Sequence, residues 1–206
     1  MRRVFLALMA MFCVMAQAQN ASQPNEARKT FDKVYNMVFG PQGSTLRYDV
    51  NIVGLYKTHG TIWYKGKKQR FSDERVNTWN DGTTAYMVFR KKKTVEIHAA
   101  NSDKKDKYSG KFKFDLNDFD YSMMTEGSDL LFVLKQHKKA SGTIKEVRAL
   151  VDSKTLTPKY VKLKVALFWA KIKISNFKYG GISDDMFVFP AKNYKEGYKW
   201  IDKRND

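Results

Sequence analysis

The chain has 206 residues, 38 lysines and arginines against 21 acidic residues, and a formal net charge of +17. Its length is typical of one domain with a sizeable core, and its single cysteine, Cys13, excludes a disulfide-stabilised scaffold. The excess of positive charge indicates anionic partners but says nothing about the fold.

The first 18 residues have the pattern of a signal peptide. Arg2 and Arg3 precede an apolar run, 4–15, and the small-x-small sequence Ala16-Gln17-Ala18 follows. The run is shorter than the ~20 residues that a membrane-spanning helix needs. We therefore predict export to the periplasm with cleavage after Ala18. The mature chain, 19–206, would lack Cys13 and hence any thiol nucleophile or thiolate metal site. In that compartment we expect anionic membrane surfaces or acidic proteins as partners, and no nucleic acid.

One amphipathic helix is predicted near the start of the mature chain, beginning at Pro24 or Asn25. Phe31, Val34, Tyr35 and Val38 recur at i, i+3, i+4 and i+7 and form one apolar stripe, and a Gly-Pro-Gln-Gly sequence at 40–43 ends the helix. The stripe either touches a ligand as a lid or simply packs on a sheet. The sequence does not separate the two interpretations.

Most of the remaining chain alternates apolar and polar residues with the period of a strand. The clearest case is Val161, Leu163 and Val165 interleaved with Lys162 and Lys164, which predicts an antiparallel sheet with one wet face. The Asp81-Gly82 dipeptide predicts a tight hairpin. The predicted strands are 44–54, 57–65, 68–73, 75–80, 84–90, 94–99, 130–135, 143–152, 159–167, 170–179 and 186–189.

Two segments interrupt the strands. Residues 101–110 are polar and charged and are predicted to form a loop. Leu116, Phe119 and Met123 fall on one side of a predicted short helix capped by Asn117 or Asp118. The predicted fold is mostly β: an open, incomplete antiparallel barrel or strongly curved sheet. The N-terminal helix and the short inserted helix would cover its concave apolar face.

Nothing in the sequence indicates an enzyme, a metal site or a cofactor. His59, His98 and His137 are far apart and have no second ligand at metal-binding spacing. A serine nucleophile elbow is missing, and the acidic residues between 103 and 120 lack the spacing of a calcium loop. Function must therefore come from what the apolar face encloses.

The middle of the chain resembles a known family. Gly60-Thr61-Ile62-Trp63-Tyr64-Lys65-Gly66, then Arg70-Phe71, then the segment from Trp79 to Tyr86 around Asp81-Gly82, is similar to the paired-strand core of the LolA-like periplasmic lipoprotein carriers. Phe187-Val188-Phe189 is similar to the closing strand of that family, and 201–204 to the ending of some members. The resemblance extends loosely from Thr30 to Arg204.

This chain departs from the family pattern at three positions. Thr83 stands where the family has the hairpin lysine, and Gly66 stands where well-studied members have an arginine thought to latch the lid. Asp73 stands two positions after Phe71, where the family often has an aromatic residue. A lipidated outer-membrane acceptor of the same fold is an alternative, but bulky Phe12 before Cys13 argues against lipidation.

The resemblance implies a monomeric periplasmic carrier that would hold lipoprotein acyl chains and pass them from an inner-membrane lipoprotein-releasing transporter to an outer-membrane acceptor. A lipid- or stress-sensing module of the same fold is the alternative, and in an ordinary barrel the same residues would merely be core. Residues 85–89 are apolar on both faces, so their inward set can be wrong by one position. The residues predicted to line the cavity are Phe31, Val34, Tyr35, Val38, Val50, Ile52, Ile62, Tyr64, Phe71, Trp79, Tyr86, Val88, Val95, Ile97, Phe132, Leu134, Val161, Leu163, Val165, Ile172 and Ile174.

Overall fold

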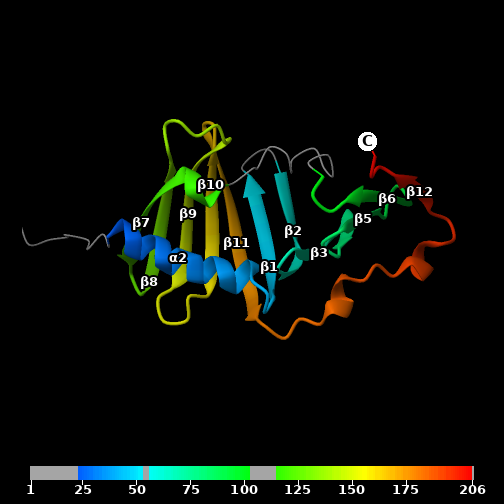
Figure 1. Ribbon diagram of the computed structural model, residues 1–206, viewed down its shortest axis with the longest axis horizontal. Coiled ribbons are helices and arrows are strands. Elements are labelled where there is room, and N and C mark those ends of the chain that lie inside the picture. Colours follow the sequence, from blue (N-terminus) through cyan, green and yellow to red (C-terminus); the bar gives the residue numbers. More distant parts are fainter. Residues whose placement is uncertain (1–22, 53–55, 103–114, 206) are drawn as a thin grey trace, which may run out of the picture.

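A computed structural model describes residues 23–52, 56–102 and 115–205 of the chain. The predicted signal peptide and most of the predicted polar loop lie outside these residues. Within them a single helix, α2 (Pro24–Phe39), precedes a large sheet (Figure 1). The strands are β1 (Ser44–Ile52), β2 (Tyr56–Lys65), β3 (Lys68–Asp73), β4 (Val76–Asn80), β5 (Thr84–Phe89), β6 (Thr94–Ala99), β7 (Phe119–Glu126), β8 (Asp129–Gln136), β9 (Ile144–Asp152), β10 (Pro158–Val165), β11 (Phe168–Tyr179) and β12 (Lys199–Asp202).

The strands form one open sheet in the order β12-β6-β5-β4-β3-β2-β1-β11-β10-β9-β8-β7. Sequential neighbours are antiparallel, because short turns connect them, and β1 closes against β11 to join the two halves. Strands β7 and β12 are the two edges, so the sheet does not close on itself. The predicted fold class, a mostly β, open, curved sheet with an N-terminal helix, is confirmed.

The short inserted helix is present as a 3-10 turn, η2 (Leu116–Asp118), but it ends before Phe119, which begins β7, a strand that was not predicted. The segment 186–189, predicted as a strand, follows a different path, with a 3-10 turn, η3 (Asp184–Phe187), at its start. Strand β12 was not predicted, and it pairs with β6 in parallel. A second 3-10 turn, η4 (Ala191–Tyr194), lies between η3 and β12.

Helix α2 lies across one face of the sheet, with its main contacts to β7, β1 and β2 (Figure 1). Pro24 occupies its first turn, where a missing N–H costs nothing, and Gly40 follows its last residue. Its apolar stripe is buried: Ala27, Phe31 and Val34 pack with β7, β8 and β9, and Val38 packs with Leu46 and Tyr48 of β1. The predicted helix and its stripe thus contact the sheet as the 3.6-residue periodicity indicates.

The C-terminal segment, 182–202, follows the other half of the sheet and covers the opposite face. Asp184 pairs with Lys65 and Lys68, each at 3.1 Å, and η3 contacts β3. Farther along, Phe189 and Tyr194 pack on Trp79 of β4. The two covers, α2 and the C-terminal segment, therefore lie on opposite faces of one twisted sheet.

Candidate functional site

Helix α2 is fastened at both ends over the sheet. Near its start, the Arg28 guanidinium donates to the Leu116 carbonyl at 3.0 Å and lies 4.7 Å from the centre of the Tyr121 ring. Near its end, the Ser44 hydroxyl donates to the Val38 carbonyl at 2.7 Å. The Gly66 amide donates to the Gly40 carbonyl at 3.0 Å. These contacts tie the start of α2 to β7 and its end to β1 and the turn after β2.

Gly66, which replaces the expected latch arginine, occupies the turn between β2 and β3. Its φ of 57° lies in the left-handed region that favours glycine, and no atom lies near the position of a β-carbon. The neighbouring cations Lys65 and Lys68 pair with Asp184, whose pKa their hydrogen bonds lower. In this chain the lysines beside that turn hold the C-terminal segment, and a backbone hydrogen bond ties the turn to the end of α2.

Fifteen of the predicted lining residues face α2 or belong to it, and we call this surface the apolar wall. Residues opposite each other in an antiparallel pair point to the same face, so the strand pairing fixes their side. The apolar wall consists of Phe31, Val34, Tyr35, Val38, Val50, Ile62, Tyr64, Phe71, Phe132, Leu134, Val161, Leu163, Val165, Ile172 and Ile174.

The part of the apolar wall that β10 and β11 form is only partly buried. Phe132 and Leu134 are fully buried, whereas the apolar residues of β10 and β11, such as Leu163 and Ile172, remain half-buried. Burial raises the pKa of Tyr64 and of Tyr121 to about 12, so both phenols are neutral at physiological pH. The wall therefore offers accessible apolar surface without charge in the stretch that α2 bridges.

Five predicted lining residues lie on the opposite face. Trp79 lies opposite Arg70, and Arg70 lies opposite Trp63, so these three side chains share one face of the sheet. Ile62 and Phe71 lie on the other face. The same pairing continues through β5 and β6. The residues whose predicted inward position was wrong are Trp79, Tyr86, Val88, Val95 and Ile97. Ile52 belongs to β1, but its side chain lies outside the described residues.

The chain itself covers much of that opposite face. Phe189 stacks on Tyr86 with ring centres 4.3 Å apart and meets Trp79 edge-on at 5.4 Å. Tyr194 stacks on Phe189 at 5.4 Å, and Trp200 approaches it at 5.8 Å. The aromatic residues of β4 and β5 are therefore occupied by the C-terminal segment.

Sequence reasoning missed several residues of the wall. Phe119, Tyr121 and Met123 are buried under α2, and their spacing of two was itself a strand signal. Phe177 joins the wall through a bulge: the register of β11 against β1 shifts there, and Asn176 has a φ of 51°. In the sequence, this bulge shows as a spacing of three positions between the apolar residues Ile174 and Phe177, where a regular strand would have two.

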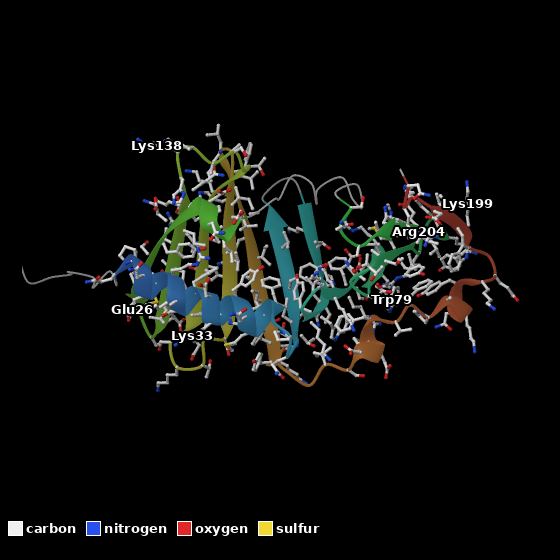
Figure 2. All side chains as sticks on the ribbon, viewed as in Figure 1. Glu26, Lys33, Trp79, Lys138, Lys199 and Arg204 are labelled. Carbon is white, nitrogen blue, oxygen red and sulfur yellow. The ribbon has the colours of Figure 1, made fainter. Side chains whose placement is uncertain are left out.

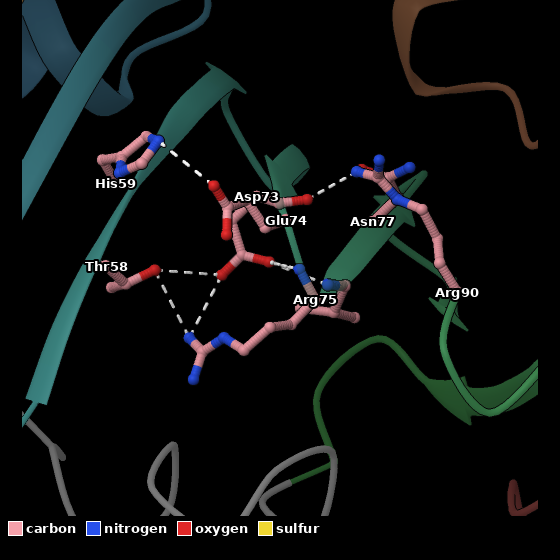
Figure 3. Close-up of polar contacts among 8 residues, drawn as sticks. Thr58, His59, Asp73, Glu74, Arg75, Asn77 and Arg90 are labelled. Carbon is pink, nitrogen blue, oxygen red and sulfur yellow. Dashed lines mark hydrogen bonds and ion pairs between the residues drawn. The ribbon is translucent and has the colours of Figure 1, made fainter.

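A polar pocket of about 260 Å³ lies beside β2 and the turn between β3 and β4, lined by His59, Gly60, Ser72, Asp73, Glu74 and Arg90. Figure 3 shows that Asp73 organises it. Its carboxylate accepts from the amides of Arg75 and Val76, both at 2.7 Å, and from the Thr58 hydroxyl at 3.2 Å. All these donors are local, so the contacts fix the turn between β3 and β4. Its lining side chains are polar or charged, unlike those of the apolar wall.

Among residues 23–52, 56–102 and 115–205, no group of three or more His, Cys, Asp or Glu side chains is arranged to hold a metal ion. Over the same residues, no helix is both long and apolar enough to span a membrane.

Comparison by sequence finds no matching family model and no curated relative. Solved structures do match. An uncharacterized conserved protein from Thermus thermophilus superposes with a TM-score of 0.58 at 8% identity, over 86% of this chain and 99% of that chain. An outer membrane lipoprotein-sorting protein domain from Vibrio parahaemolyticus matches with a TM-score of 0.45 at 7% identity, over 84% and 99%. A LolA superfamily protein from Nitrosomonas europaea matches with a TM-score of 0.41 at 10% identity, over 80% and 98%.

LolA-like proteins are among the structural neighbours of this chain. At these identities the likeness concerns the fold.

Proposed function

We propose that this protein is an exported, periplasmic carrier that binds the acyl chains of lipoproteins along the apolar wall and delivers them toward the outer membrane. The observation that carries the proposal is that the apolar-wall residues of β10 and β11, beneath α2, are only half-buried. The signal-peptide pattern and the LolA-like motifs support the same function.

Such a carrier needs only apolar contacts with its cargo. An acyl chain left in water costs ~0.8 kcal/mol per CH₂ group, so a soluble carrier must hide it. Apolar side chains such as Leu163 and Ile172 supply that shelter without directional contacts. Neutral tyrosines at the wall, Tyr64 and Tyr121, add surface without a charge that would need solvation. Weak, non-directional contacts also allow release.

The proposed route follows from the family resemblance. A single mature chain, 19–206, would receive its cargo from an inner-membrane lipoprotein-releasing transporter and pass it to an outer-membrane acceptor. The proposed role is binding and transfer, without a chemical reaction.

The test compares two neighbouring residues on opposite faces of β11. Ile174 belongs to the apolar wall, whereas Ser175 is exposed on the outer face opposite Arg47. Ile174→Glu should weaken binding of a fluorescent triacylated lipopeptide about tenfold or more, because a carboxylate on the wall must be desolvated. Ser175→Glu, with the same change in charge, should bind as the unmodified protein does. Circular dichroism would verify that both variants fold. Equal binding by the two folded variants would contradict the proposal.

A transfer experiment separates a carrier from the alternative sensing module. Loaded mature protein is mixed with acceptor vesicles, and the lipopeptide is followed from protein to membrane. Passage to the vesicles supports the carrier. Tight retention with no transfer would favour a sensing module of the same fold.

A further inference from the structure

The hairpin between β10 and β11 ends in an exposed apolar tip. Val165 pairs with Phe168, so Ala166 and Leu167 form a two-residue loop. Leu167 is 88% exposed, Phe168 65% and Trp169 37%. Large apolar side chains gathered at a protruding turn are unusual on a soluble protein and indicate a surface that becomes covered.

The turn is not one that the backbone prefers. Two-residue hairpin loops favour asparagine, aspartate or glycine, because one or both positions need a positive φ. Here Ala166 adopts a φ of 53°, and the bulky Leu167 follows. The tip keeps apolar residues where polar turn residues would stabilise the hairpin better.

Cations flank this tip on the outer face of the sheet, away from α2. Strand pairing places Arg148, Lys162 and Lys171 in one row across β9, β10 and β11. Lys164 is opposite Trp169 in the row nearer the tip, and Lys173 lies farther down β11. We call these five residues, Arg148 and the four lysines, the cationic stripe.

Aromatic rings hold most of these cations. Lys162 and Lys171 lie 5.2 and 4.8 Å from the centre of the Tyr160 ring, and Arg148 and Lys164 lie 5.0 and 5.9 Å from that of Trp169. Arg148 also pairs with Glu146 at 2.7 Å, whereas among the described residues no carboxylate lies within ion-pair distance of Lys162, Lys164 or Lys171. The stripe therefore presents net positive charge beside interfacial aromatic residues.

A second loop reinforces the charge at this end of the molecule. Ile144, which begins β9, pairs with Val165 at the end of β10, so the loop before it adjoins the hairpin tip. That loop carries the exposed Lys138 and Lys139, and Figure 2 shows Lys138 at the end of the sheet where this loop lies.

We propose that the tip of the β10–β11 hairpin and the cationic stripe dock this protein onto a bilayer that carries anionic phospholipid. Leu167 and Phe168 insert among the acyl chains, Trp169 lies at the headgroup level, and the lysines meet lipid phosphates. Each lysine or arginine near an anionic surface adds a modest electrostatic attraction, which suits reversible binding. Spread cations and a narrow convex tip match a fluid surface of many phosphates better than a protein pocket. The cationic stripe and Trp169 lie on the outer face, whereas Phe168 lies opposite Val165, on the side of the apolar wall. This docking does not depend on cargo.

Vesicle flotation of the cargo-free mature protein tests the proposal. Binding to vesicles of phosphatidylcholine with phosphatidylglycerol should exceed binding to phosphatidylcholine alone and should fall with salt. The variant Leu167→Ser/Phe168→Ser should lose about tenfold or more in vesicle partitioning. Val188→Ser, at a residue that is 63% exposed elsewhere, should not change it. Equal partitioning of these two variants would overturn the proposal.

A charge-matched pair tests the cationic stripe. Lys164→Gln/Lys171→Gln should lower partitioning about tenfold and reduce its dependence on phosphatidylglycerol. The exposed pair Lys154→Gln/Lys192→Gln removes the same charge and should have little effect. Ile174→Glu should keep vesicle binding, which would separate docking from cargo capture. If instead Ile174→Glu abolishes vesicle binding, the apolar wall binds the lipid and the docking proposal fails.

Labelling shows which part enters the bilayer. Cys13 is the single cysteine and lies in the predicted signal peptide, so a cysteine introduced in the mature chain is labelled alone. An environment-sensitive dye on Leu167→Cys should shift to the blue on phosphatidylglycerol vesicles, whereas the same dye on Thr155→Cys, in the turn before β10, should not. A shift at both positions, or binding only to lipopolysaccharide and not to phosphatidylglycerol, would overturn the proposal.

Discussion

Asp73 is the acid that fixes the turn between β3 and β4. Its side chain is 1% exposed and accepts hydrogen bonds from two backbone amides, from Thr58 and from Arg75 (Figure 3). The Arg90 guanidinium also donates to the Asp73 carbonyl. A buried carboxylate is tolerated only when its lone pairs are satisfied in this way.

We therefore expect Asp73→Asn to destabilise the protein. The amide group would place an N–H₂ where donors already converge, and leaving such donors unsatisfied costs about 1–3 kcal/mol. Urea unfolding followed by circular dichroism would show a lower midpoint. The adjacent Glu74, whose side chain is 81% exposed, supplies the control, since Glu74→Gln should leave the midpoint unchanged. Equal midpoints for the two variants would show that the network contributes little.

At individual positions the sequence predicted the apolar wall well wherever one face was clearly polar. Leu163 alternates with Lys162 and Lys164, and its position on the wall follows from that alternation. Tyr86 and Val88 were assigned to the wrong face because β5 is apolar on both sides: Met87 is buried on one and Val88 on the other. The reason is physical, since cover on both faces removes the alternation that indicates direction.

Among the elements, sequence reasoning did not find two strands, β7 and β12, and β12 has no local signal. It has four residues, and its pairing with β6 joins segments about a hundred residues apart, so no local pattern indicates it. The contact that secures it is equally distant: the Lys203 ammonium lies 2.9 Å from a carboxylate oxygen of Glu96, which also accepts from His98 at 3.1 Å.

This contact should make β12 sensitive to acid. Burial tends to raise the pKa of Glu96, but hydrogen bonds from Lys203 and His98 outweigh that effect and hold it below its usual value. A carboxylate with a lowered pKa stabilises the fold above its unfolded-state pKa, and this contribution is lost as the pH falls through the lowered value. We expect 199–202 to exchange amide hydrogens faster below about pH 4, after correction for intrinsic rates.

The variant Glu96→Gln should show faster exchange of β12 already at neutral pH and little further change on acidification. Asp202→Asn is the matched control within β12. The Arg204 guanidinium lowers the pKa of Asp202 to about 2, so Asp202 stays ionised over most of that range, and its exposed pair contributes little. Exchange that is equally fast in both variants would assign the acid sensitivity to a different group.

At the scale of the whole molecule, the two faces of one twisted sheet have different roles. Helix α2 bridges the face of β7 to β2, where apolar residues stay half-exposed, whereas the C-terminal segment packs closely on the opposite face of β3 to β6 (Figure 1). Figure 2 shows Trp79 in the half of the sheet that the C-terminal segment follows. An accessible apolar face suits a ligand, and a face filled by the chain's own aromatic residues suits stability.

Two phenylalanines, one on each face, allow these two roles to be tested separately. Phe71 lies on the apolar wall and stacks on Tyr48 at 5.5 Å, whereas Phe189 packs on Tyr86 and Trp79. Both are half-buried, so truncation of either to alanine should cost about 2–3 kcal/mol, less than in a full core. Only Phe71→Ala should also weaken lipopeptide binding, by several-fold, because it removes surface that contacts the acyl chain. Binding measured on folded protein well below the unfolding temperature distinguishes the two effects. If Phe189→Ala weakens binding as much as Phe71→Ala does, the ligand contacts the C-terminal segment, and the separation of a binding face from a structural face is wrong.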